Sequence, residues 1–333
     1  MSAEAKQHHY IPQCYLRGFL PPDQDKPELT ILDLRERRTF TTGTRNIGGE
    51  RNFNRIEAEG VSPDGLEGSL SSFETIAADA LRAVCGRQGL ADKHAFIVLM
   101  NLIALLAVRN PQVRKNWSDS LAQLSKMLLH ITLARKERWE HTIQGIKARG
   151  IPVDDNITYE EIRDFFKSGE YKIETPTENH IFHEFHGIDA VLPFLLNRTW
   201  SLITTADSAG PFVTCDRPVS IWWKHPEEIP APFRHSPGFG MTDTIVLFPI
   251  SSCMLMAGEF EDKDRVFPAD GVLVANEELV AHMNSQIILF AVRWIYASDL
   301  SFSFIDYGTR RLKPGSDLFN CLTKTAPHPR NPQ

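Results

Sequence analysis

The chain has 333 residues, of which 42% are hydrophobic and 23% charged, and its formal net charge is −6. This composition is typical of a soluble globular protein and argues against a disordered or fibrous chain. Five scattered cysteines without a C-x-x-C pair argue against a disulfide framework and a cysteine-rich zinc site, so we expect a reducing, cytoplasmic location.

No membrane contact is expected. Residues 1–7 are polar and no apolar run follows them, so they do not resemble a signal peptide. The most apolar stretch, residues 95–108, contains Asn101 and is shorter than the roughly 20 residues that span a bilayer. We therefore expect a buried core helix there.

The stretch HHYIPQCYLRGF, residues 8–19, predicts a short helix with signals at both ends. Pro12 suits the first helical position, and Gly18 suits the position just past the end. One face of this helix should be buried, because apolar side chains recur every four positions at Ile11, Tyr15 and Phe19.

The elements that follow change in character along the chain. Residues 29–34 and 38–42 predict a hairpin. Helices are then expected at residues 63–84, 92–109, 111–150 (with a possible break), 158–167 and 178–196. From Thr199 on, short apolar runs predict strands at residues 199–205, 211–215, 221–223, 244–250, 253–260 and 293–297, with a helix at 276–291.

This order predicts an α+β fold with a small N-terminal β-hairpin region, a predominantly helical middle and a mixed strand and helix C-terminal portion. We place the boundaries at residues 1–62, 63–196 and 197–325, which can also form one composite domain. The Pro-rich tail, residues 326–333, is expected to be disordered.

Two segments are basic although the chain is acidic overall. Residues 35–55 carry six Arg against two acids, and residues 109–149 carry nine Lys and Arg against three acids. Such segments are candidate contacts for nucleic acid. The alternative is that they are solvated faces of ordinary elements.

His8 and His9 precede the helix in extended backbone, where adjacent side chains point to opposite sides. The two rings therefore do not share one task. Histidine suits a general base or a metal ligand, because its unperturbed pKa is near 6.5. In the alternative interpretation, one ring caps the helix and the other fills a surface groove.

The opening motif resembles the signature H-H-Y-[I/V]-P-x-x-Y-L-R-x-F of a bacterial family known only as a domain of unknown function. Cys14 departs from it, since that family often has an aromatic residue there. The likeness also includes Asn52 and Phe53, Glu74, the junction formed by Arg109, Pro111 and Arg114, and the strand end at residues 214–219.

The H-H-x-[I/V]-P pattern is also similar to the opening of ββα-metal nucleases of the His-Asn-His type. That resemblance implies His8 as a metal ligand, His9 as the base that activates water, and Asn52 or Asn54 as the residue that orients it. The next helix offers Glu67 or Glu74 where those nucleases have histidine, and the spacing from His9 to Asn52 is long. The implied cofactor is a divalent metal, Mg or Mn.

Asp216 follows a predicted strand and is pinned by Pro218, so its carboxylate has a defined direction. It either joins the histidines or bonds its own backbone in an Asx turn. His180, His183, Glu184 and His186 are expected to form a solvated helix face, because H-x-x-H-E has neither known zinc order.

The favoured hypothesis is a metal-dependent phosphodiester hydrolase, nuclease-like, with His9 as general base. Its expected catalytic residues are His8, His9, Asn52 and Asp216. Its expected metal ligands are His8, Glu74 and Asp216, and its expected substrate contacts are Tyr10, Arg17, Arg51, Arg109 and Arg114. One alternative is a non-catalytic module that binds an anion, another ligand or nucleic acid; another is a purely structural N-terminal plug.

Overall fold

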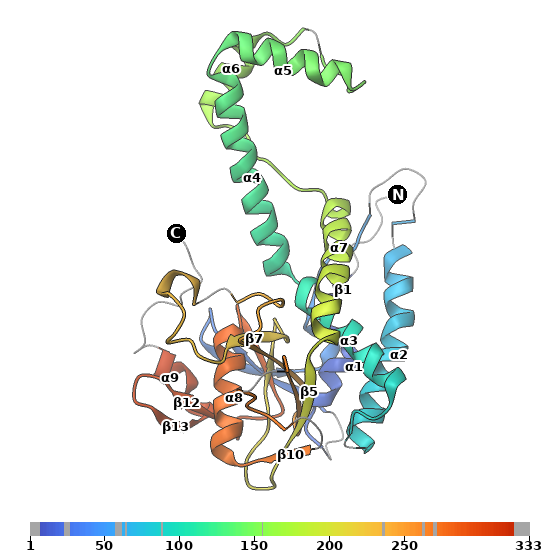
Figure 1. The fold of residues 1–333 in the computed structure, drawn as a ribbon, viewed down its shortest axis with the longest axis vertical. Helices are drawn as coiled ribbons and strands as arrows, with labels where there is room; N and C mark the ends of the chain where they lie inside the picture. The colour runs from blue at the N-terminus through green and yellow to red at the C-terminus, as the bar shows by residue number, and fades with distance from the viewer. Residues whose placement is uncertain are drawn as a thin grey trace. The chain divides into compact units, whose positions relative to one another are not determined.

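The computed structural model describes residues 7–22, 27–56, 62–63, 65–87, 89–154, 156–234, 237–261, 264–268 and 272–322 (Figure 1). The tail at residues 326–333 lies outside them. The chain divides into two compact units, residues 1–110 with 181–333 (unit 1) and residues 111–180 (unit 2). Helices and strands are mixed, which confirms the predicted α+β class.

In the described part of unit 1, the larger sheet has the strand order β10-β5-β9-β8-β7. Neighbouring strands are antiparallel except β10 and β5, which run parallel. Its members are β5 (Thr199–Thr205), β7 (Ser220–Trp223), β8 (Thr244–Ser251), β9 (Met254–Glu259) and β10 (Val272–Ala275).

A second, antiparallel sheet of unit 1 has the order β3-β2-β11-β6. Its members are β2 (Leu29–Asp33), β3 (Arg38–Thr42), β6 (Thr214–Cys215) and β11 (Trp294–Ala297). Two further ribbons pair β1 (Gln7–His9) with β4 (Gly49–Arg51) and β12 (Ser303–Asp306) with β13 (Arg311–Pro314).

The helices of unit 1 pack against these sheets. They are α1 (Gln13–Leu16), α2 (Gly65–Arg87), α3 (Lys93–Val108), α8 (Glu277–Phe290), α9 (Leu318–Leu322) and the larger part of α7 (Thr177–Leu196). Helix α3 is the predicted core helix, and most of its side chains are buried. Its start is fixed by Asp92, whose carboxylate accepts hydrogen bonds from the backbone N–H groups of His94 and Ala95.

Two hydrophobic clusters form the core of unit 1. The first joins α1, α2 and α3 to strands of the larger sheet, through side chains such as Tyr15, Leu81, Leu99 and Phe248. The second lies around α8 and includes Phe212, Ile287 and Phe302. Because α2 and α3 share a core with strands from the C-terminal half, the division into units differs from the boundaries expected at residues 62 and 196.

Unit 2 is helical. It contains α4 (Pro111–Leu133), α5 (Lys136–Ala148), α6 (Tyr159–Ser168) and the first residues of α7. The predicted break in the segment 111–150 falls between α4 and α5. Thr158 and Glu161 form a reciprocal capping box at the start of α6, and the Tyr159 hydroxyl donates to the Leu133 carbonyl at 2.8 Å.

The predicted hairpin at β2 and β3 is confirmed, as are the helices of the middle region. Strands β1, β4, β10, β12 and β13 were not predicted, because runs of three or four residues give no clear period. Among the described residues no single helix has the length and hydropathy needed to cross a bilayer, although α3 and α4 taken together would pass by length and composition.

Candidate functional site

The C-terminal part of the opening motif anchors the N-terminus in the core. Tyr15 is fully buried, and its hydroxyl donates to the Pro249 carbonyl at 2.7 Å and pairs with the Thr214 hydroxyl at 2.7 Å. Its ring stacks on Phe248 with centroids 5.2 Å apart. Ile11 and Phe19 are also buried, which confirms the predicted apolar face.

Gly18 has a different role from the one predicted. It lies inside the 3-10 turn Arg17–Phe19 that follows α1, rather than just past a helix end. A Cβ atom on Gly18 would lie 2.6 Å from the Ile250 carbonyl oxygen, and the Gly18 carbonyl accepts a hydrogen bond from the Ser252 N–H at 2.9 Å. Glycine is therefore required here for close approach to β8.

The histidine pair lies on β1, which is held against β4 with His8 opposite Glu50. The backbone N–H groups of Tyr10 and Ile11 both donate to the Gly48 carbonyl, so the chain turns into α1 directly after the strand. As expected for extended backbone, the two rings differ: His8 is buried and His9 is half-buried.

His8 is oriented by Asn54. The Asn54 backbone N–H donates to His8 Nδ1 at 2.9 Å, so Nδ1 is an acceptor and the neutral ring carries its proton on Nε2. The Asn54 side-chain amide donates to Glu67 Oε1, and that oxygen lies 3.7 Å from His8 Nδ1. Asn54 therefore fixes both the tautomer of His8 and the carboxylate beside it.

Arg109 ends α3 inside this cluster. Its Nη2 donates to Asn54 Oδ1 at 2.6 Å, and both Nη atoms lie 3.4 Å from the His9 carbonyl oxygen. Its Nε lies 3.9 Å from Glu184 Oε2, and both side chains are about 95% buried. The guanidinium also covers the Phe53 ring at 5.4 Å. A buried carboxylate thus positions a buried cation, which in turn holds Asn54.

His9 has the features of a base. Burial lowers its pKa below the ordinary 6.5, against the raising effects of a hydrogen bond with the Arg45 backbone and of the nearby Glu67 carboxylate. Its Nε2 is buried and has no hydrogen-bond partner among the described residues, which assigns the Arg45 bond to Nδ1. His9 is therefore neutral near pH 7, with an unpaired lone pair on the buried Nε2.

Two glutamates of α2 face this cluster. Glu67 and Glu74 are separated by two helical turns, which places them on one side of the helix. The pKa of Glu74 is raised, first by burial and then by the Glu67 carboxylate, although Arg109 and Arg17 oppose the shift. Glu74 thus retains its proton to a higher pH than an exposed glutamate does.

Asp216 lies close enough to Tyr10 to act on it electrostatically, and its carboxylate is engaged by the backbone. Its two carboxylate oxygens accept hydrogen bonds from the backbone N–H groups of Val292, Arg293 and Trp294, at 2.8, 2.7 and 3.2 Å. These bonds fix the start of β11. Burial nevertheless raises the pKa of Asp216. The alternative interpretation was that Asp216 bonds its own backbone in an Asx turn. Asp216 does bond backbone N–H groups, but they belong to residues distant in sequence.

Of the other expected residues, Tyr10 and Arg17 lie beside the cluster, since Tyr10 packs on Phe53 and Arg17 acts electrostatically on Glu74. Asn52 has a left-handed backbone (φ 57°) in the turn after β4, and Arg51 is exposed at the end of that strand. Tyr10 is buried, with its ring centroid 5.7 Å from that of Phe53. Arg17 is exposed on unit 1, and Arg114 lies on α4 in unit 2.

The expected metal ligands were His8, Glu74 and Asp216. Within the described ranges, no group of three or more His, Cys, Asp or Glu side chains could hold a metal ion. His8, Glu74 and Asp216 are all described, and both oxygens of Asp216 accept hydrogen bonds from the backbone at β11. Metal binding by these three residues stays a prediction.

Residues 7–301 match the family described as "Protein of unknown function (DUF4238)". The chain belongs to this family. The DUF4238 region begins at β1 and extends beyond β11, so it contains the whole histidine cluster. Membership of a family of unknown function is thereby confirmed, while the likeness to nucleases stays a prediction. No curated protein and no solved structure matches the chain.

The DUF4238 site includes one residue that the sequence interpretation missed. Glu184 was expected on a solvated helix face, but it is buried against Arg109. Arg109 is the sequence feature that could have indicated a buried glutamate. It lies at the end of a core helix, where a buried cation needs a buried counter-charge. Of its histidine neighbours, His180 belongs to unit 2, where its Nε2 lies 3.1 Å from the Ser118 hydroxyl.

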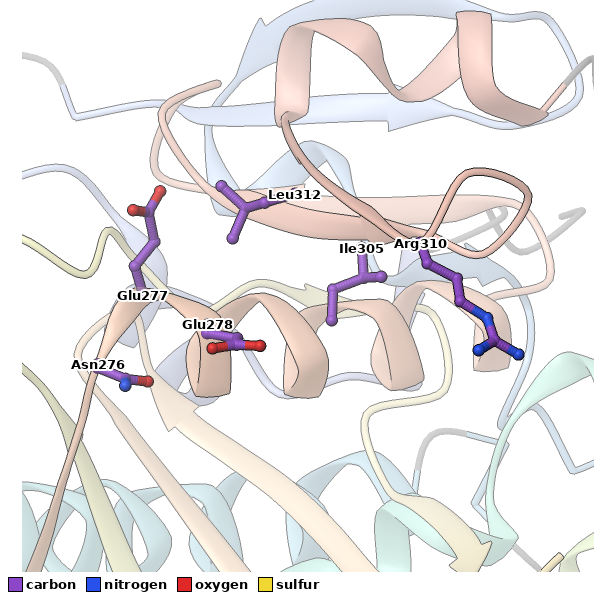
Figure 2. Close-up of a pocket in the computed structure, with 6 residues that line it drawn as sticks. All are labelled: Asn276, Glu277, Glu278, Ile305, Arg310 and Leu312. Carbon is purple, nitrogen blue, oxygen red and sulfur yellow. The ribbon is translucent and has the colours of Figure 1, made fainter.

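A separate open cavity of about 430 Å³ lies at the start of α8 (Figure 2). Figure 2 shows the Glu278 carboxylate and the Arg310 guanidinium on either side of Ile305. Two of its polar residues support the fold, since Asn276 caps α8 and Glu277 accepts a hydrogen bond from the Ser303 hydroxyl. The histidine cluster is therefore the stronger candidate site in this DUF4238 chain.

Proposed function

We propose that the histidine cluster hydrolyses phosphodiester bonds of nucleic acid, with His9 as the general base. The observation that carries the proposal is the hydrogen bonding and the lowered pKa of the His9 ring. Its Nε2 has no hydrogen-bond partner among the described residues, its other ring nitrogen is held by the Arg45 carbonyl, and its pKa is lowered. A neutral imidazole with an unpaired lone pair can abstract a proton from water, and the proposal requires that water reaches this buried nitrogen when substrate binds.

In the proposed reaction, His9 Nε2 takes a proton from a water molecule as that water attacks phosphorus. The departing oxygen then needs a proton. Glu74 is the candidate donor, because burial and Glu67 raise its pKa. His8, held through Nδ1, is a fixed hydrogen-bond donor at Nε2 rather than a second base.

Cationic groups near the cluster favour an anionic substrate. Arg109 and Arg17 act electrostatically on Glu74, so both lie near the expected path of the proton. Arg45, whose carbonyl holds His9, has an exposed side chain. Arg51 at the end of β4, the strand that pairs with β1, is also exposed. Arginine side chains suit phosphate because they offer paired donors.

The predicted Mg or Mn is not used in this mechanism, because the described residues do not offer a three-ligand group. The test therefore compares hydrolysis with and without added metal. Hydrolysis in EDTA equal to that with added Mg²⁺ or Mn²⁺ supports acid–base catalysis by the side chains alone. Activity only with added metal would restore the metal-dependent form of the prediction.

The test is hydrolysis of single-stranded RNA, single-stranded DNA, duplex DNA and bis(p-nitrophenyl) phosphate by the purified chain. His9→Gln should lower the rate about 100-fold or more while the fold is kept, since general base catalysis contributes roughly 10²–10⁴. His94→Gln is the matched control, because His94 is exposed on α3. Equal rates for His9→Gln and the wild type would remove the base role, and salt-sensitive binding without turnover would favour the binding module.

A further inference from the structure

Two cysteines of unit 1 flank one hydroxyl group. Cys85 lies in the last turn of α2, and Cys253 lies in the turn that joins β8 to β9. The Ser251 hydroxyl is 3.3 Å from Cys253 Sγ, and the Cys85 thiol hydrogen-bonds the same side chain. Two sulfurs that contact one oxygen lie within roughly 7 Å of each other, the sum of two long sulfur–oxygen hydrogen bonds.

The two thiols differ in accessibility. Cys253 is exposed and lines an open cavity of about 390 Å³ together with Thr205, Asp207 and Met254. Cys85 is half-buried and packs against the first hydrophobic cluster. An oxidant can therefore reach Cys253 from solvent, whereas Cys85 is shielded but adjacent.

We propose that Cys85 and Cys253 form a redox modification site that hydrogen peroxide converts to a disulfide. Cys253, as the thiolate, attacks one peroxide oxygen, so an S–O bond forms, the O–O bond breaks and the leaving hydroxide takes a proton. Cys85 loses its proton and attacks the Cys253 sulfur, so the S–S bond forms and the S–O bond breaks with release of water. Two thiols are oxidised by two electrons, and one peroxide is reduced to two waters.

The order of these steps follows from the surroundings of each sulfur. Burial, with a further contribution from Cys253, raises the pKa of the Cys85 thiol, so it is the poorer first nucleophile. The bond itself requires the sulfurs to approach to about 2.05 Å, which needs rotation of both side chains and a shift of the short β8–β9 turn. The backbone of that turn is held by hydrogen bonds of Ser252 with Gly18 and Phe212 and of Cys253 with Thr205, so closure of the disulfide has to strain or break some of these bonds.

The disulfide would connect α2 to the β8–β9 turn. Helix α2 carries Glu67 and Glu74, which face the histidine cluster, so oxidation acts on the element that presents both carboxylates. The other cysteines have different environments. Cys215 is buried with its sulfur on the Arg217 backbone, and Cys14 lies near Glu74.

The test oxidises the full chain with hydrogen peroxide, blocks remaining thiols with N-ethylmaleimide and maps the unreduced tryptic peptides by mass spectrometry. A peptide that joins Cys85 to Cys253 and separates on reduction with dithiothreitol is expected. It should be absent from Cys85→Ser and Cys253→Ser and retained in Cys14→Ser, with circular dichroism to confirm that each variant is folded.

The contrary result is Cys253 over-oxidised to sulfinic or sulfonic acid while Cys85 of the wild type is recovered with the alkylating label. A linked peptide that pairs Cys253 with Cys14 or with a second chain would equally overturn the proposal. Both readouts come from the wild-type chain, so they do not depend on the folding of any variant. Neither depends on the proposed hydrolysis.

Discussion

The backbone N–H of Asn54 donates to Nδ1 of His8 at 2.9 Å, joining the turn after β4 to the first strand of the chain. The same residue accepts from Arg109 through Oδ1 and donates to Glu67 through its side-chain amide. Asn54 is fully buried, so each of these groups depends on it to satisfy a polar atom away from water.

Asn54→Leu should therefore lower the free energy of unfolding by about 3 kcal/mol or more, because a buried guanidinium and a carboxylate each lose a partner. Urea denaturation measures the change. Asn46→Leu is the control, since Asn46 is exposed and its side-chain amide donates to the nearby Thr42 hydroxyl. A loss below about 0.5 kcal/mol in Asn54→Leu would contradict the central position given to Asn54.

Arg109 and Glu184 are expected to be energetically coupled, because each buries a charge beside the other. In a double-mutant cycle of Arg109→Met and Glu184→Gln, each single change should destabilise the chain, since it leaves one buried charge uncompensated. The double variant should lose about 1–3 kcal/mol less than the sum of the singles. Strict additivity in urea unfolding would show that the pair does not interact.

Asp216→Asn should reduce stability by about 1–3 kcal/mol, because an amide nitrogen cannot accept the hydrogen bonds offered by residues 292–294. The folded variant should keep the wild-type pH dependence of hydrolysis, since Asp216 supports β11. Asp207→Asn is the control at an exposed aspartate. A stable variant with a changed pH dependence of hydrolysis would show that Asp216 is one of the catalytic residues.

Glu74→Gln should stabilise the fold near neutral pH while it lowers hydrolysis. The folded-state pKa of Glu74 lies above its unfolded value, so the fold disfavours the ionised form. The stability that this shift contributes is present below about pH 4.5 and is lost as pH rises through the folded pKa. The free-energy difference between variant and wild type should therefore grow in favour of the variant from pH 4 to 7.

Unfolding by urea at several pH values checks this dependence, and subtraction of the wild type removes contributions from other groups. Glu278→Gln, at an exposed glutamate of α8, provides the control and should show no such slope. If Glu74→Gln were destabilising at pH 7, Glu74 would be a net stabilising ion-pair partner of Arg109 or Arg17.

The fold was predictable where local patterns are strong. The spacing of Ile11, Tyr15 and Phe19 predicted that these three side chains are buried, although only Tyr15 lies within α1, and the hydropathy of residues 95–108 predicted the core helix α3. The short strands β1 and β4 were not predictable, because their pairing depends on contacts between residues about 40 positions apart. The two histidines could be identified from the local motif that contains them. Their partners could not, because they are distant in sequence.

Among the site residues, the choice between Asn52 and Asn54 shows this limit. Both follow β4, but the left-handed backbone at Asn52 turns the chain and places Asn54 against His8. Glu184 could not be identified because it shares one helical arc with His180, His183 and His186, while its cation, Arg109, lies at the end of another helix. Such long-range pairing of buried charges leaves no period in the sequence.

The measurement that most directly tests the account is the pH dependence of kcat/KM for phosphodiester hydrolysis by the wild type and His9→Gln. Only neutral His9 can act as the base, and its pKa is lowered. The kcat/KM of the wild type should therefore decrease on acidification with a midpoint below pH 6.5. That decrease should vanish in His9→Gln, with the remaining rate about 100-fold lower. A decrease on acidification that persists unchanged in His9→Gln would show that His9 is not the base.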